Sequence, residues 1–221
     1  MSLLSPAVSI EIADAIATIR FNRPAERNPL SSSTLLELNT LLTDARANRE
    51  IKAIIFTGSE DVFLSGANIR ELAELDSDSA LDFSRLGQQI FQTIADAKQI
   101  TISAIDGYCM GGGLDLALAC DIRVASATAV FSHPGARLGI ITGWGGTQRL
   151  PRIIGKSAAL EMILTARRMD AREALHLGLV TSVSNEPFRD ALSMAQKQIQ
   201  IATSSSEIEQ FPFGSLQSFA Q

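Results

Sequence analysis

The chain of 221 residues is 46% hydrophobic and 19% charged, a balance typical of a folded domain and unlike that of a disordered tail or a coiled coil. A chain of this length should bury about 70% of its extended-chain surface on folding. Its net charge of −5 and the lack of a basic block argue against a nucleic-acid partner, because that binding depends largely on neutralising phosphates.

Membrane insertion, secretion and disulfide bonding are not expected either. No apolar run reaches the roughly 18 residues of a membrane span, and the first residues lack the basic and apolar segments of a secretion signal. Cys109 and Cys120 are too few for a disulfide scaffold or a metal cluster and are most simply small buried residues. We therefore expect a soluble α/β protein of the cytoplasm.

Strand and helix patterns alternate along the first half of the chain. Two short strand patterns around Asp14 predict a hairpin, and the possible N-caps Ser31–Thr34 precede leucines at helical spacing. The apolar run Ala53–Thr57, bounded by Gly58, predicts a buried strand. The expected elements are strands at 8–12, 15–21, 53–57 and 101–105, and helices at about 31–45 and 79–97.

The second half continues this alternation and then becomes mostly helical. A glycine triplet should begin a helix at about 114–119. The further elements expected are strands at 122–125, 129–131 and 180–183, and helices at 157–165, 171–177 and 188–201. With no repeat period and no linker, we predict one α/β core over residues 1–183 and a helical C-terminal segment over 184–221. The stretch from Thr203 to Phe213-Gly214 lacks caps, so we expect this segment to be incomplete.

Several common kinds of active site are absent from the sequence. The two histidines, His133 and His176, have no partner at metal-ligand spacing, so no metal is expected. There is no G-x-S-x-G elbow and no P-loop, and the run Gly111–Leu116 lacks the third glycine of the dinucleotide fingerprint.

Two glycine-containing segments follow strands and precede short helices. They are Phe63–Asn68, after the strand ending at Thr57, and Gly111–Gly113, after the strand ending near Ile105. Glycine lets the backbone approach a ligand, and the unpaired N–H groups of a first helical turn bind an oxyanion. Two such groups aimed at one oxygen would form an oxyanion hole. From spacing alone, two ordinary tight turns are about equally well supported.

Taken together, several segments resemble the crotonase, or enoyl-CoA hydratase/isomerase, family from about residue 8 to 183. The segments are Asn22–Pro24, Phe63–Leu72, Asp106–Ala117, Cys120–Arg123, Gly139–Ile141, Gly145–Arg152, Gly155-Lys156 and Ala174–Val180. The resemblance implies a right-handed spiral of ββα units with a helical C-terminal part. It also implies assembly as a homotrimer or a dimer of trimers.

The resemblance implies an acyl-CoA thioester as substrate, with coenzyme A as part of that substrate and no separate cofactor. The oxyanion-hole N–H groups would belong to Ala67 and Gly112. The other positions carried over as substrate-binding are Ala25, Arg27, Ser65, Asn68, Ile69, Arg70, Gly111, Gly135 and Trp144. Instead of binding substrate, Arg27 and Arg70 could be solvated surface charges, and Trp144 could pack in the core. Asp121 is expected to hold a loop.

The catalytic carboxylates are where this chain departs from the family. Hydratases of the family use two glutamates; the first position corresponds to Asp115 here and the second to Gly135. A third position, where some relatives carry an aspartate, corresponds to Gly143. Asp115 is therefore the main acid–base candidate, with capping of its helix as the structural alternative. His133 is the weaker candidate, either ordering water with Asp115 or serving only as a structural histidine.

The function expected is that of an enoyl-CoA hydratase/isomerase-like enzyme, a lyase of fatty-acid or related acyl-CoA catabolism. The alternatives are isomerisation, decarboxylation or thioester hydrolysis with Asp115 as the sole carboxylate. A further alternative is a weakly active acyl-CoA-binding protein, since Gly135 has no side chain to transfer a proton.

Overall fold

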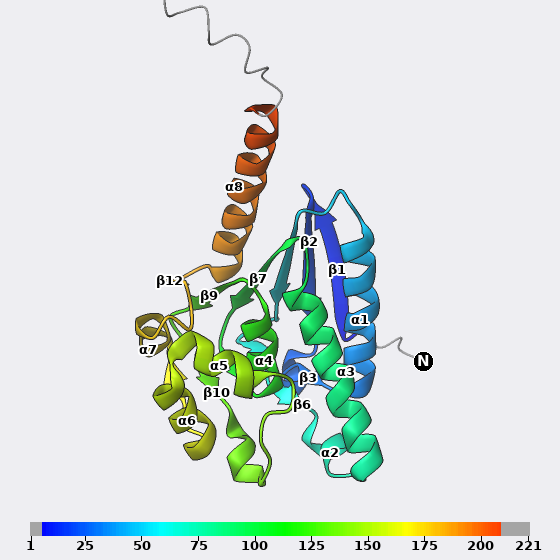
Figure 1. Ribbon diagram of the computed structural model, residues 1–221, viewed down its shortest axis with the longest axis vertical. Helices are drawn as coiled ribbons and strands as arrows, with labels where there is room; N and C mark the ends of the chain where they lie inside the picture. The colour runs from blue at the N-terminus through cyan, green and yellow to red at the C-terminus, as the bar shows by residue number, and fades with distance from the viewer. Residues whose placement is uncertain (1–5, 209–221) are drawn as a thin grey trace, which may run out of the picture.

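The computed structural model describes residues 6–208, and its largest sheet begins with a hairpin (Figure 1). β1 (Val8–Ala13) and β2 (Ile16–Phe21) pair antiparallel around Asp14 and Ala15, which both have positive φ, 51° and 63°. Two such residues match the primed turns that suit tight hairpins. The remaining strands of this sheet run parallel to β2, in the order β1-β2-β4-β7-β9-β12. They are β4 (Ala53–Thr57), β7 (Ile100–Ile105), β9 (Ile122–Ser126) and β12 (Ser182–Ser184).

Strand β4 is apolar throughout because both of its faces are covered. Ile54 and Phe56 pack into the main core, whereas Ala53 and Ile55 face a smaller cluster on the other side of the sheet. This is the pattern expected of a central parallel strand, and it confirms the buried strand predicted there.

A second, smaller sheet lies beside the first, in the order β11-β10-β8-β5. Its strands are β5 (Val62–Leu64), β8 (Tyr108–Met110), β10 (Val130–Ser132) and β11 (Met169–Asp170), and a separate short pair joins β3 (Pro29–Leu30) to β6 (Gly66–Ala67). The chain repeatedly passes from a strand of the large sheet to a strand of the small sheet and then into a helix. That succession gives the ββα units that the resemblance implies.

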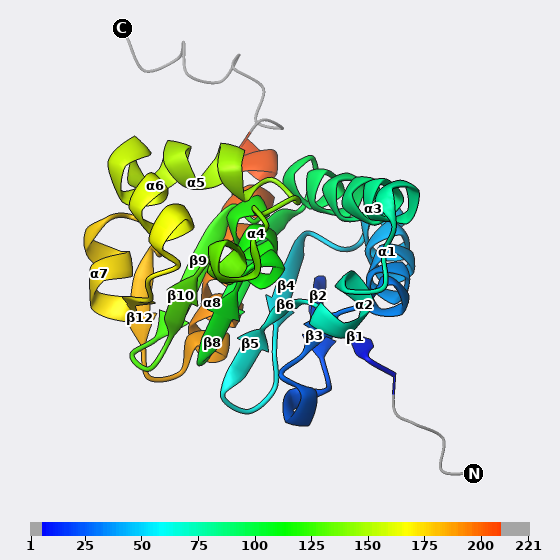
Figure 2. The same ribbon diagram turned by 90° about the horizontal axis from the view of Figure 1, so that it is seen from below.

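Helices cover the main core side by side, in the order α1, α3, α4, α5 and α6, and each contacts the next (Figure 2). Among them α4 is almost wholly buried, which fits its apolar sequence on every side. The α-helices are α1 (Ser32–Ala47), α2 (Ile69–Leu72), α3 (Ser77–Ala95), α4 (Gly112–Ala119), α5 (Gly146–Ile154), α6 (Lys156–Thr165), α7 (Ala171–His176) and α8 (Pro187–Ile208). Two short 3₁₀ helices, η1 (Pro24–Glu26) and η2 (Pro134–Leu138), complete the set within residues 6–208.

Helix α8 packs on the opposite face of the large sheet, where Ala191 and Ala195 contact its strands. The small side chains let the helix approach the sheet closely, and its far end extends beyond the rest of the molecule (Figure 1). The predicted helix at 188–201 is therefore present and longer than expected. The segment Phe211–Gly214 lies outside the described residues.

Short strands such as β3, β8 and β11 were not predicted, and three further differences concern segments named in the prediction. Phe63–Asn68, expected as a loop, contains the short strands β5 and β6. Helix α5 begins at Gly146, whereas a helix was expected only after Pro151. The earlier start was missed because no side-chain cap marks it. Strand β12 begins two residues later than predicted, at Ser182.

Candidate functional site

The two glycine segments singled out in the sequence meet in the structure. A Cβ built on Gly66 would lie 3.0 Å from the backbone nitrogen of Gly112, and one built on Gly112 would lie 3.6 Å from the nitrogen of Ala67. Gly66 also has a φ of +95°, a conformation that other residues rarely adopt. The backbones of β6 and of the α4 start therefore approach each other directly, as the prediction of an oxyanion hole requires.

The position of Gly112 at the start of α4 leaves its amide available to a ligand. The first hydrogen bond of this helix runs from the N–H of Asp115 to the carbonyl of Gly111, at 3.0 Å. The N–H groups of the helix residues before Asp115 make no hydrogen bond within the helix. Both Gly112 and Ala67 line a cavity of about 280 Å³, named the inner pocket below.

The inner pocket brings together most of the residues proposed from the sequence. It is lined by Ser65, Ala67, Ile69, Gly111, Gly112, Asp115, His133, Gly135 and Trp144. Its other walls are mainly apolar and come from α2, the loop after it, α3, η2 and the segment before α5. Their apolar residues are Leu72, Leu75, Phe83, Leu138, Ile140 and Ile141. Such a lining with few polar groups is typical of a small-molecule site.

Trp144 packs in the core and also lines the inner pocket. Its ring packs edge-on against Phe83 and Phe91, at centroid distances of 5.1 and 5.6 Å, and its Nε1–H donates to the Phe83 carbonyl at 3.3 Å. It is only 5% exposed and still lines the inner pocket. A Cβ on Gly112 would lie 2.3 Å from the ring, so the indole fits directly against the backbone of that glycine.

Asp115 and His133 form a buried polar pair in this pocket. They are 1% and 2% exposed, and Asp115 Oδ1 lies 3.4 Å from His133 Nε2. The other carboxylate oxygen, Oδ2, accepts a hydrogen bond from the hydroxyl of Thr142. The Asp115 side chain therefore turns toward Thr142 and His133 in place of capping its own helix.

Burial shifts the pKa values of the two groups in opposite directions. It raises the pKa of Asp115 from 3.8 to about 7, against the opposing effects of the Thr142 hydroxyl and of the nearby backbone of Trp144 and Gly146. It lowers the pKa of His133 from 6.5 to about 4. In both cases the charged form loses its hydration. Near neutral pH, His133 is therefore uncharged and Asp115 can both accept and release a proton.

Two glycines border this pair closely. A Cβ on Gly146 would lie 2.2 Å from Asp115 Oδ1 and 2.8 Å from His133 Nε2, so only glycine fits there. A Cβ on Gly135 would lie 2.8 Å from the carbonyl oxygen of Ile140. The missing second carboxylate therefore cannot be restored at Gly135 without a backbone shift.

A larger outer cavity, of about 680 Å³, adjoins the inner pocket and shares Ser65, Ala67, Ile69 and Pro134 with it. The other predicted residues Ala25, Arg27, Asn68 and Arg70 line this outer cavity. Arg137 and Arg168, which the sequence did not single out, join Arg27 and Arg70 on its wall. Guanidinium groups bind phosphate oxygens in pairs, so this cavity suits an anionic ligand.

The buried Asn28 holds the Arg27 side of the outer cavity. Its amide donates to the carbonyls of Val62 and Phe63, at 2.9 and 3.2 Å, and its Oδ1 accepts from the N–H of Arg23 at 2.7 Å. These bonds tie the segment around Arg27 to β5. Asn68, on the neighbouring wall, caps α2 by accepting from the N–H of Arg70 at 3.0 Å.

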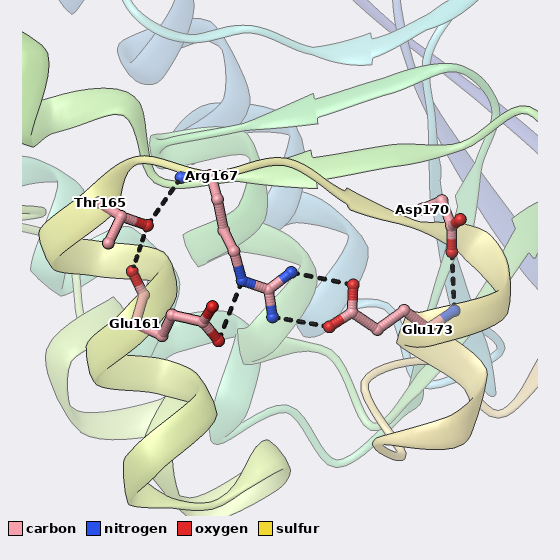
Figure 3. Close-up of polar contacts among 5 residues, drawn as sticks. All are labelled: Glu161, Thr165, Arg167, Asp170 and Glu173. Atoms are coloured by element: carbon pink, nitrogen blue, oxygen red, sulfur yellow. Dashed lines mark hydrogen bonds and ion pairs between the residues drawn. The ribbon is translucent and has the colours of Figure 1, made fainter.

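The Arg168 side of the cavity is held by its neighbour Arg167 (Figure 3). The Arg167 guanidinium makes a two-pronged pair with Glu173, at 2.9 and 2.6 Å, and its Nε lies 3.1 Å from Glu161 Oε2. The carbonyl of Ala166 accepts from Ser132 Oγ and from Arg137, at 3.4 and 3.2 Å. Helices α6 and α7 thus fix the segment that carries Arg168.

Sequence reasoning missed Thr142, Gly146, Arg137 and Arg168. Thr142 and Gly146 flank a glycine-rich stretch but contribute only through the fold, which brings them to Asp115 from a distant part of the chain. The two arginines stand in no periodic or motif pattern, so no signal in the sequence marked them.

The structural expectations for Asp121 and the cysteines are confirmed. Asp121 Oδ2 accepts from the backbone N–H and the hydroxyl of Thr101, at 2.8 and 2.7 Å, which anchors the turn before β9. Cys109 and Cys120 are free and buried. Within residues 6–208, no three His, Cys, Asp or Glu side chains gather as metal ligands. Every helix in that range is too short or too polar to cross a membrane.

Comparisons with known proteins identify the family of the chain. A family model described as enoyl-CoA hydratase/isomerase matches residues 11–210. The short-chain-enoyl-CoA hydratase of Clostridium acetobutylicum is 37% identical over 198 residues, which are 88% of this chain and 76% of that protein. A probable enoyl-CoA hydratase of Mycobacterium tuberculosis, echA8, is 40% identical over 86% of this chain and 72% of its own length.

Solved structures give the same result. Enoyl-CoA hydratase from Bacillus anthracis superposes with a TM-score of 0.83 at 34% identity, covering 86% of this chain and 76% of that one. DspI from Pseudomonas aeruginosa reaches a TM-score of 0.84 at 34% identity, covering 88% and 80%. The chain therefore belongs to the enoyl-CoA hydratase/isomerase, or crotonase, family.

Proposed function

We propose that this protein adds water across the α,β double bond of an enoyl-CoA thioester. The reaction passes through an enolate whose negative oxygen is bound by the backbone N–H groups of Ala67 and Gly112. The observation that carries this is the direct approach of those two backbone segments beside one buried carboxylate, Asp115. The relatives named as enoyl-CoA hydratases support the same reaction.

The two amides act because charge develops on the thioester oxygen. In the ground state that oxygen is a carbonyl, and in the enolate it carries the negative charge. Donors fixed at one point favour the second state over the first, and one such donor is typically worth about 2.7–4 kcal/mol. Their fixed position on β6 and on the first turn of α4 avoids reorganisation during the reaction.

Asp115 moves the proton in both halves of the reaction. Its ionised carboxylate takes a proton from water, whose oxygen forms the new bond to the β carbon while the double-bond electrons move onto the thioester oxygen. The protonated Asp115 then gives that proton to the α carbon as the enolate collapses. Water is added, and the carboxylate returns to its starting state. A pKa of about 7 suits a group that must both accept and release a proton.

The outer cavity accommodates the coenzyme A portion of the substrate, and the inner pocket the acyl portion. Arg27, Arg70, Arg137 and Arg168 supply positive charge for phosphates on the outer side. The thioester then lies where the two cavities join, next to Ala67. Coenzyme A enters only as part of the substrate, with no separate cofactor.

The Asp115→Asn variant tests the acid–base assignment. Asparagine keeps the shape and the contact with Thr142 but cannot take a proton, so kcat/KM for hydration of crotonyl-CoA should fall by at least about 10²-fold. In the wild type, kcat/KM should rise with pH until about 7, because Asp115 must first lose its proton. Asp82→Asn, at an exposed carboxylate on α3, is the matched control. Equal rates for Asp115→Asn and wild type would remove Asp115 from the mechanism.

Isomerisation of a β,γ-enoyl-CoA is the second candidate, and Gly135 is the observation that favours it. A single carboxylate is sufficient to carry a proton from one carbon to another on the same face. A panel of acyl-CoA substrates followed by liquid chromatography and mass spectrometry separates hydration from isomerisation, decarboxylation and thioester hydrolysis. Binding without turnover of any substrate would indicate an acyl-CoA-binding protein.

We also propose that the chain acts in the cytoplasm as a homotrimer or a dimer of trimers. The extension of α8 beyond the sheet gives a surface for subunit contacts (Figure 1). Sedimentation equilibrium measures the assembly; a monomer at micromolar concentration would contradict it.

A further inference from the structure

Three buried polar atoms in the inner pocket have no hydrogen-bond partner within the described part of the chain. They are Asp115 Oδ1 and both ring nitrogens of His133. Unpaired buried polar atoms are rare because burying such an atom without a partner is unfavourable. Since both residues line the pocket, a polar group of a ligand or a water molecule is the natural partner.

We propose that His133 is a second catalytic residue, which holds the attacking water together with Asp115 and so replaces the missing carboxylate at Gly135. This inference rests on the proposed hydration. It adds the identity of the group that positions the nucleophile.

The distance between the two atoms fits a shared water. Asp115 Oδ1 and His133 Nε2 are 3.4 Å apart, outside a good direct hydrogen bond, and a water at ordinary hydrogen-bond distance can contact both. Thr142 occupies the other carboxylate oxygen, which leaves Oδ1 for the water. Gly146 closes one side of the pair, so the water must lie toward the pocket.

Burial keeps His133 neutral. Around the pair, Arg149 favours the ionised form of Asp115, and the Cys109 thiol lies near Asp115 with its pKa raised well above 9.0 by burial, so it stays protonated. A neutral imidazole has one N–H donor and one acceptor nitrogen, so it can orient a water without competing for its proton. Asp115 then takes that proton, and the water oxygen is directed at the β carbon.

Two variants of His133 test this assignment. His133→Phe removes both nitrogens at similar size and should lower the hydration rate by about 10²-fold or more. His133→Gln keeps a terminal amide and should retain more activity than His133→Phe. His176→Gln, at the exposed histidine ending α7, is the matched control and should hydrate at the wild-type rate. Thermal unfolding and the Kd for a saturated acyl-CoA confirm that each variant is folded.

Exchange of the α hydrogen of butyryl-CoA in D₂O separates this inference from the proposed function. That exchange needs the enolate and Asp115 but no attacking water, so it should survive in His133→Phe. Hydration at the wild-type rate in His133→Phe would overturn the inference, and so would equal loss of exchange and hydration. Exchange without hydration in the wild type would also overturn it. Absence of both reactions in the wild type would overturn the proposed function itself.

Discussion

Gly146 shows how strongly one missing side chain can constrain the site. Its Cβ position lies 2.2 Å from Asp115 Oδ1 and 2.8 Å from a methyl of Thr142. In Gly146→Ala the added methyl must displace the carboxylate, and overpacking of this kind typically costs about 1–3 kcal/mol. We expect the variant to unfold at lower urea concentration and to lose most hydration activity.

The matched control for packing is Gly143→Ala, three residues earlier in the same segment. Its Cβ would meet only Ser84 Oγ, at 3.4 Å, so the free energy of unfolding should hardly change. If Gly146→Ala were as stable and as active as wild type, the tight contact with Asp115 would not be real.

At this scale the sequence predicted the residues with distinctive chemistry and missed their neighbours. Asp115 stood out because the resemblance places it at the first catalytic glutamate of the family, and His133 because it lies two positions before Gly135. Thr142, which fixes the carboxylate, has ordinary chemistry and reaches Asp115 only because the chain folds back. The roles assigned to Ala67 and Gly112 came from family resemblance, since spacing alone left tight turns equally possible.

At the scale of elements, the ion cluster around Arg167 joins α6 to α7 and supports the outer cavity (Figure 3). Arg167 is 24% exposed and its partner Glu173 38%, so solvent weakens the pair. In Arg167→Met we expect a loss of about 1 kcal/mol, a fall in Tm of roughly 2–4 °C. Because Arg168 is the next residue, KM for the acyl-CoA should rise several-fold while kcat stays nearly constant.

Arg189→Met is the control for this prediction. Arg189 pairs with Glu186 at 2.9 Å, but both side chains are largely exposed, so neither Tm nor KM should change. Differential scanning calorimetry and steady-state kinetics give the two readouts. If Arg167→Met lowered Tm but left KM unchanged, the ion cluster would stabilise the fold without supporting the outer cavity.

Long elements were predictable and very short ones were not. The helix α3 shows a helical period in the sequence, and the strands β4 and β7 are apolar runs long enough to be recognised. By contrast, β3 and β6 have two residues each, too few for any alternation, and they exist because the fold brings them side by side. These two strands nevertheless position Ala67.

For the molecule as a whole, alternation of strands and helices predicted an α/β fold, and the ββα succession is confirmed. Periodicity could not predict that β5, β8 and β10 form a sheet of their own, because pairing between distant segments leaves no local pattern. The same holds for the meeting of residues 66–67 with 111–112, on which the site depends.

The buried pair also affects how the stability of the whole fold varies with pH. Between pH 3.8 and about 7, folded Asp115 keeps a proton that the unfolded chain has lost, so stability falls as the pH rises. Between about pH 4 and 6.5, the unfolded chain protonates His133 while the folded protein does not, so stability rises with pH. The two slopes, each up to about 1.4 kcal/mol per pH unit, oppose each other and nearly cancel in the wild type.

Removing either Asp115 or His133 should end this cancellation, so that the stability of each variant varies with pH more steeply than that of the wild type. Relative to wild type, Asp115→Asn should become more stable as the pH rises from 3.8 to about 7, because it lacks the loss of stability that Asp115 causes there. Relative to wild type, His133→Gln should become less stable as the pH rises from about 4 to 6.5, because it lacks the gain that His133 provides there. Urea unfolding at several pH values measures the free energy of unfolding of both variants. Taking differences from the wild type removes the contribution of other carboxylates. One of these is Asp76, whose pKa is lowered by its bonds to Ser79. Curves that stay parallel to the wild type across this range would mean that the two side chains titrate in the folded protein as they do in the unfolded chain.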